Sequence, residues 1–287
     1  MTDPDATRLR QGKPSATAQG AAEGRAAHQL LDRPLVFEDP LALRILGRDG
    51  EANLRAELAN HQTPLMRALR GQFVGRGRYA EDALAAAVGR GTRQYVVLGA
   101  GLDTYACRHA DGAVRVFEVD HPATQAWKRD RLTEIGLDIP ASLAFAPIDF
   151  ETEGLREALS RAGFDHSART FIACLGVSYY LQNEQFYETL RWAASLARDS
   201  KFVFDFMPPP SRQSAQMRAV VEQVAAQVTA QGEPLRSYFE PAELAGRMLA
   251  LGFREAEAVT AAQVNAQYFE RLGSKLRMGG YLMRAGV

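Results

Sequence analysis

Two strand-like runs, one ending in glycines and the other in an acid, constrain this chain more than any other feature. The apolar run at residues 94–98 stops at Gly99 and Gly101. The run at 114–119 stops at Asp120, about 20 residues after Gly101, which is the spacing of a first βαβ unit that binds a nucleoside. In such a unit the glycines let the backbone approach the ligand, and the acid bonds the ribose hydroxyls. Asp120 could instead cap a helix that begins at Pro122.

Strand and helix patterns alternate through the rest of the chain. Alternation of this kind predicts an α/β protein with a doubly wound, mostly parallel sheet. Strands are expected at 94–98, 114–119, 142–147, 169–175 and 201–206, with two weaker ones at 254–259 and 278–284. Helices are expected between them at 122–135, 153–163 and 183–198.

Helical patterns also precede the sheet and interrupt it. Residues 1–90 are expected to form an N-terminal helical cap, with separate helices at 64–72 and 79–88, and residues 91–287 to form the core. Within the core, 207–240 is expected to be a helical insert. Its helix would start at Ser211, because Pro208 to Pro210 stop the preceding strand and the valines that follow form one stripe. We expect this insert to act as a lid.

Composition excludes several classes of partner. The 34 basic and 34 acidic residues cancel, which argues against nucleic acid or an anionic membrane as the main partner. Cys107 and Cys174 fit no metal-ligand spacing, so we expect no metal and a reducing, cytoplasmic location. The N-terminal sequence has no secretory pattern, and no apolar run approaches the ~20 residues of a membrane span. We expect a monomer or a homodimer.

The glycine turn also bears on the cofactor. A dinucleotide fold continues to a third glycine that packs the helix under a pyrophosphate, and this chain has Asp103 near that point. A cofactor without phosphates therefore fits better, and S-adenosylmethionine (SAM) is one. A nicotinamide-dependent reductase and a SAM-binding protein without catalytic activity remain as alternatives.

Other strand ends add candidate contacts. Asp149 and Phe150 follow the third strand, where they could meet an adenine or simply start a helix. Leu175 ends the fourth strand, just before Tyr179 and Tyr180, which could shape a substrate pocket or only pack. Arg76, upstream of the first strand, could hold a cofactor carboxylate or be an ordinary surface charge.

With these motifs in view, the chain resembles the leucine carboxyl methyltransferase-like family, in particular its bacterial O-methyltransferases of polyketide and other secondary metabolism. The resemblance covers nearly the whole chain. It includes Arg76-Gly-Arg78-Tyr-Ala-Glu-Asp82, Leu98-Gly-Ala-Gly-Leu-Asp103, Phe117-Glu-Val-Asp120-His-Pro with Lys128, Asp149-Phe150 and Gly176-Val-Ser-Tyr-Tyr-Leu181.

The resemblance implies a seven-stranded Rossmann-like methyltransferase sheet that uses SAM. It implies that Arg76 holds the SAM carboxylate, Gly99 and Gly101 its amino-acid part and Asp120 the ribose, with Asp149 and Phe150 at the adenine. Leu175 would be a further cofactor contact, at the position where the eukaryotic protein-modifying members have a glutamate. This difference favours a small-molecule acceptor, methylated on a carboxylate or a hydroxyl, over a protein C-terminus, which remains the alternative.

The chemistry of the acceptor decides whether a base is needed. A carboxylate is ionised near pH 7 and needs none, whereas a phenol or an alcohol needs one. His121 is the one histidine expected at the strand ends, and His28 in the N-terminal helix could also reach a substrate. No catalytic residue can be assigned from the sequence.

Overall fold

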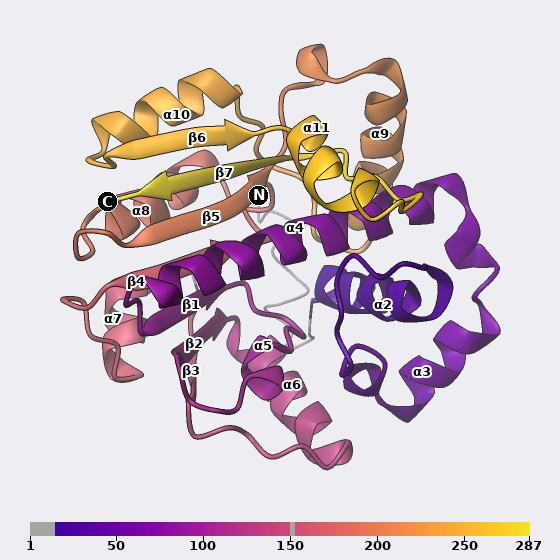
Figure 1. Ribbon diagram of the computed structural model, residues 1–287, viewed down its shortest axis with the longest axis horizontal. Coiled ribbons are helices and arrows are strands. Elements are labelled where there is room, and N and C mark those ends of the chain that lie inside the picture. Colours follow the sequence, from indigo (N-terminus) through magenta and orange to yellow (C-terminus); the bar gives the residue numbers. More distant parts are fainter. Residues whose placement is uncertain (1–14, 150–152) are drawn as a thin grey trace, which may run out of the picture.

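The computed structural model describes residues 15–149 and 153–287 and contains a seven-stranded sheet with helices on both faces (Figure 1). Its strand order is β3-β2-β1-β4-β5-β7-β6, and β7 runs antiparallel to both neighbours, whereas the other pairs are parallel. The strands are β1 (Gln94–Leu98), β2 (Arg115–Asp120), β3 (Leu143–Pro147), β4 (Thr170–Cys174), β5 (Lys201–Phe206), β6 (Glu255–Val259) and β7 (Tyr281–Gly286). The expected doubly wound, mostly parallel sheet is confirmed.

Helices fill the connections and cover the sheet. The α-helices are α2 (Ala16–Leu31), α3 (Gly47–Ala56), α4 (Pro64–Gly89), α5 (Tyr105–Arg108), α6 (Pro122–Glu134), α7 (Leu155–Arg161), α8 (Asn183–Ala194), α9 (Ala215–Ala230), α10 (Pro241–Ala250) and α11 (Ala261–Val264). No helix within the described residues is long and apolar enough to cross a bilayer.

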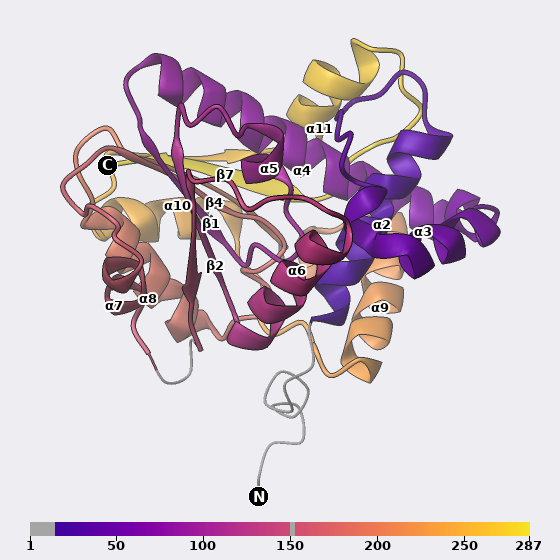
Figure 2. The same ribbon diagram turned by 90° about the horizontal axis from the view of Figure 1, so that it is seen from below.

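Two apolar cores hold the layers together, one on each face of the sheet. On one face α7, α8 and α10 pack on the phenylalanines of β5 through side chains such as Leu159, Phe186 and Met248. On the other face α4 packs on β1 and β4 through residues that include Val74 and Leu84. Figure 2 shows the sheet between these two groups of helices. Because both faces are covered, the central strands β1, β4 and β5 are almost wholly buried.

Helix α4 differs from its expected form. The sequence predicted two helices, at 64–72 and 79–88, but the structure has one continuous helix of 26 residues. Two glycines of this helix are sites of close packing: a Cβ on Gly71 would lie 2.0 Å from the Arg277 carbonyl oxygen, and one on Gly75 would lie 3.1 Å from Phe269. Packing thus offsets the cost of glycine inside a helix, about 1 kcal/mol per residue.

The insert also starts later than expected. Ser214, not Ser211, caps α9 by accepting from the Met217 amide, and residues 210–212 form a short 3₁₀ turn instead. The helix is therefore one turn shorter at its start than the expected 211–231. The division of the chain at residue 90 into cap and core stays a prediction; α4, which ends at Gly89 within the expected cap, packs on the sheet of the expected core.

Candidate functional site

One large cavity, of about 1740 Å³, opens at the carboxyl ends of the parallel strands. Besides residues of α2, of 175–188 and of the loop 231–236, its lining contains two regions that differ in character. The glycine half is formed by residues 97–103, 120–121 and 148–149 around the ends of β1, β2 and β3. The helical half is formed by 64–73 of α4, 217–228 of α9 and 275–280 before β7. The expected site residues that line this cavity are Arg76, Gly99, Gly101, Asp120, Asp149 and Leu175; Phe150 lies outside the described residues.

The glycine turn after β1 has a conformation that other residues rarely adopt. Gly99 and Gly101 have φ angles of +65° and +49°. A Cβ on Gly99 would lie 2.2 Å from the Val177 side chain, and one on Gly101 would lie 2.9 Å from Ala18 of α2. Side chains are therefore excluded here both by backbone strain and by space, which leaves bare backbone facing the cavity.

Asp120 lies opposite this turn with both carboxylate oxygens bonded to backbone amides. Its Oδ2 accepts from the Gly101 N–H at 2.6 Å and its Oδ1 from the His121 N–H at 2.7 Å. Burial nevertheless raises the pKa of this carboxyl, against the two hydrogen bonds. The helix that follows is capped by His121, whose Nδ1 accepts from the Ala123 amide, so the alternative role of Asp120 as the N-cap is wrong. Each oxygen keeps acceptor capacity for a hydroxyl donor.

A buried ion pair supports the turn from beneath. Lys128 Nζ lies 2.5 Å from Glu118 Oε2 and 2.6 Å from the Asp103 carbonyl oxygen, and both side chains are 1% exposed. Burial raises the pKa of Glu118 to about 7, although Lys128 opposes this. The motif contained both residues, but their pairing depends on α6 folding back over β2 and was not predicted.

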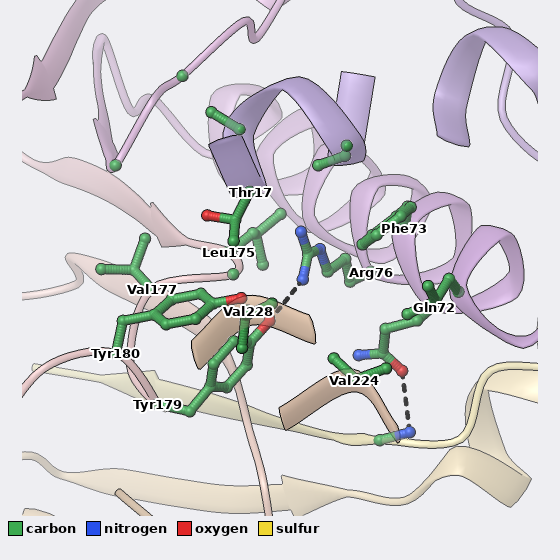
Figure 3. Close-up of a pocket in the computed structure, with 18 of the residues that line it drawn as sticks. Thr17, Gln72, Phe73, Arg76, Leu175, Val177, Tyr179, Tyr180, Val224 and Val228 are labelled. Carbon is green, nitrogen blue, oxygen red and sulfur yellow. Dashed lines mark hydrogen bonds between the residues drawn. The ribbon is translucent and has the colours of Figure 1, made fainter. Parts of the chain in front are cut away.

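Arg76 is held at the junction of the two halves. Its Nη1 lies 2.8 Å from Asp205 Oδ2 and donates to the Tyr179 hydroxyl at 2.9 Å (Figure 3). Asp205, which is fully buried at the end of β5, also accepts from the Gly176 amide at 2.6 Å. A Cβ on Gly176 would lie 2.6 Å from the guanidinium, so glycine is required beneath Arg76. The role of Asp205 was not predicted, although its place at a strand end was the available signal.

The helical half is mainly apolar. Phe73 of α4 faces Val224 and Val228 of α9, and Figure 3 shows these side chains around one space. Gln72 connects α4 to β5 and to the segment before β7. Its Oε1 accepts from the Gly280 amide at 2.9 Å, and its Nε2 donates to Asp205 at 3.3 Å. This half can therefore enclose an apolar molecule next to Arg76.

One glutamate joins two segments that cover the cavity. Glu233, in the loop after α9, accepts from the Ala16 amide at 2.8 Å and the Ser15 hydroxyl at 3.0 Å, and it also bonds Thr17 at the first turn of α2. Amides at a helix start attract a carboxylate, because they lack partners within the helix. We call these contacts the Glu233 clasp. The clasp therefore joins the loop after α9 to the start of α2 (Figure 2).

The two candidate histidines differ in access. His28 is fully buried; its Nδ1 bonds Asp32 at 3.0 Å and its Nε2 accepts from the Val36 and Phe37 amides. The idea that His28 reaches a substrate is therefore wrong, because both ring nitrogens are already bonded inside the fold. His121 does line the cavity, in its glycine half. Among the described residues no group of three His, Cys, Asp or Glu could hold a metal ion.

Comparison with known proteins agrees with this geometry. The family model for leucine carboxyl methyltransferase matches residues 18–194. The chain is 30% identical to YktD of Bacillus subtilis (strain 168), named as a SAM-dependent methyltransferase, over 91% of this chain and 93% of the relative. A protein of Mycobacteroides abscessus with the same description of activity is 34% identical over 58% of this chain and 55% of its own length.

Solved structures support the fold. A DUF574 family protein from Streptomyces avermitilis matches with a TM-score of 0.52 at 15% identity, over 85% of this chain and 95% of that one. The SAM-dependent methyltransferase SibL, in its apo form, matches with a TM-score of 0.50 at 12% identity, over 99% of this chain and 74% of that one.

The glycine turn alone left a nicotinamide-dependent reductase open, and the family match excludes it. The methyltransferase fold expected from the resemblance is likewise confirmed. The chain belongs to the leucine carboxyl methyltransferase family and is a SAM-dependent methyltransferase.

Proposed function

We propose that this enzyme binds SAM in the glycine half and methylates an oxygen of a small molecule held in the helical half. The observation that carries the proposal is the size and division of the cavity. At about 1740 Å³ it exceeds the roughly 300–1,000 Å³ of a typical ligand pocket, so cofactor and acceptor can occupy it together.

The donor groups of the glycine half match the parts of SAM. The guanidinium of Arg76 suits the cofactor carboxylate, and the carboxylate of Asp120 suits the ribose hydroxyls. We assign the adenine to the neighbourhood of Asp149, and an apolar contact to Leu175. SAM supplies an electrophilic methyl group, whose transfer breaks the carbon–sulfur bond and leaves the electron pair on sulfur. The chain itself has to align the acceptor oxygen, which can lower the barrier by roughly 7–11 kcal/mol.

A carboxylate acceptor is favoured over a hydroxyl. Among the described residues that line the helical half there is no His, Asp or Glu to serve as a base. Tyr179 and Tyr180 border this half, but burial raises the pKa of Tyr180 to about 12 and that of Tyr179 well above its ordinary value, so both stay protonated. An ionised carboxylate attacks without a base, and no proton has to leave.

A small acceptor fits the enclosure of the site. The Glu233 clasp and α9 cover the cavity, and Leu175 stands where the protein-modifying members of the family have a glutamate. We therefore prefer a small molecule of secondary metabolism to a protein C-terminus.

The free thiols Cys107 and Cys174 suit a reducing cytoplasm.

Two measurements test this function. Calorimetry should show binding of S-adenosylhomocysteine (SAH) and no binding of NADH. A panel of carboxylic acids, phenols and a leucine-terminated peptide should then be incubated with methyl-labelled SAM, and a labelled ester of a small acid is the expected product. Label on the peptide alone would contradict the small-molecule acceptor, and label on phenols alone would contradict the carboxylate.

A further inference from the structure

The charged side chains of the helical half all have the same sign. Arg67, Lys275 and Arg277 line it and are exposed, and the described residues that line this half include no acid. Arg277 Nε lies 3.8 Å from Glu270, which compensates its charge in part. The glycine half has the opposite character, since Asp103, Asp120 and Asp149 line it.

Two of these cations lack a partner. Elsewhere in the described chain Lys128 pairs with Glu118 and Lys201 pairs with Glu255. By contrast, the side chain of Lys275 forms no ion pair or hydrogen bond with any described residue, and neither does that of Arg67. In a chain whose total charge is zero, unpaired cations at a cavity wall indicate a ligand with negative charge.

The position of Arg67 also fixes how far along α4 it lies from Arg76. Arg67 precedes Arg76 on α4 by about 13 Å, at a rise of about 1.5 Å per residue. The segment that carries Lys275 runs beside the same part of α4, because the backbone at Arg277 packs directly on Gly71. Phe73, Val224 and Met278 line the same cavity as these cations and Arg76.

On the basis of the proposed function, we infer that the acceptor is an amphipathic anion. Its apolar body lies between Phe73 of α4 and Val224 of α9. An anionic group at one end contacts Arg67 and Lys275, and the oxygen that receives the methyl group lies at the other end, near Arg76. These two cations determine specificity and take no part in methyl transfer.

A matched pair of fluorescent probes tests this inference. Anilinonaphthalenesulfonate has an aromatic body and a sulfonate, and phenylnaphthylamine has the same body without the charge. Both are titrated into enzyme saturated with SAH, whose binding is first measured by calorimetry. We expect the sulfonate to bind about tenfold more tightly than the neutral probe, because two charge-assisted contacts are added.

Three variants locate the effect. Arg67→Gln combined with Lys275→Gln should remove the preference for the sulfonate and leave the neutral probe and SAH unchanged. Arg48→Gln combined with Arg198→Gln removes two exposed arginines outside the cavity and should retain the preference. Val224→Asp should weaken both probes, since it places a carboxylate on the apolar wall.

The outcomes separate this inference from the proposed function. If SAH does not bind, the proposed function fails. If SAH binds but the two probes bind equally, or if the Arg67 and Lys275 variant keeps the preference, the inference is overturned and the methyltransferase function stands. Unchanged probe binding in Val224→Asp overturns it as well, because the amphipathic anion then binds outside the helical half.

Discussion

The two halves of the cavity differ in what their charged groups contact. In the glycine half Asp120 is held by two backbone amides, Asp103 Oδ1 accepts from the Tyr105 amide, and the buried pair of Glu118 and Lys128 supports the turn. In the helical half Arg67 and Lys275 have no described partner. The first half is preorganised by its own chain, whereas the second half leaves its charges available to a ligand.

This difference fits the two kinds of ligand that we propose. The cofactor is the same whatever the acceptor, so it can be bound by groups fixed at strand ends, where short turns restrict the conformation of the backbone. An acceptor that differs between related enzymes is better bound by side chains on α4 and α9, because residues on the surface of a helix can be substituted without disturbing the sheet. The glycine half should therefore tolerate substitution much less than the helical half.

The largest effect should come from Asp120→Asn. The substitution keeps the size of the side chain and one oxygen acceptor but removes the charge that we assign to the ribose hydroxyls. We expect SAH to bind about 100-fold more weakly by calorimetry, since a hydrogen bond to a charged group contributes about 1.5–3 kcal/mol. Asp130→Asn, an exposed position on α6, is the matched control. Equal affinity in both variants would remove Asp120 from the cofactor site.

A smaller effect should appear in the pH dependence of stability. The pKa of Glu118 is raised by burial from 4.5 to about 7, so the folded state binds this proton more tightly than the unfolded chain does. The free energy of unfolding should therefore fall by about 3 kcal/mol as the pH rises from below about 4.5 to above about 7. Urea titrations at several pH values measure this slope.

Glu118→Gln provides the comparison for that slope. The glutamine cannot ionise, so the contribution of this site should disappear, although the variant will be less stable because Lys128 loses its partner. A slope in the variant equal to that of the wild-type enzyme would show that Glu118 does not titrate in this range.

The smallest effect should come from a substitution in the Glu233 clasp, which joins two segments that cover the cavity. Glu233→Gln weakens the bonds to the first turn of α2, and we expect SAH to dissociate about fivefold faster, a change of about 1 kcal/mol. SAH should also protect the segment 207–240 from proteolysis less well than in the wild-type enzyme. Glu222→Gln, which changes an exposed side chain of α9, should leave both measurements unchanged. Equal rates in the two variants would show that the Glu233 clasp does not retain the ligand.

Local patterns were sufficient for much of the fold. Six of the seven strands begin within one residue of the expected position, because an apolar run bounded by turn residues is a local signal; β7 was expected at 278–284 and lies at Tyr281–Gly286. The expected gap in α4, at residues 73–78, is wrong, because close packing at Gly71 and Gly75 accompanies one continuous helix. Their actual role depends on a segment that follows some two hundred residues later.

The sequence by itself determined the glycine turn, the acid at the end of β2 and hence a nucleoside cofactor, because these depend on spacing within one βαβ unit, and the family resemblance identified that cofactor as SAM. Only the tertiary structure decided that Asp205 holds Arg76, that Glu233 joins α2 to the insert, and that His28 is a buried structural residue. Each of these contacts joins segments that lie apart along the chain, or depends on burial that such segments create. Their geometry therefore arises from packing of the whole chain, which no local residue pattern encodes.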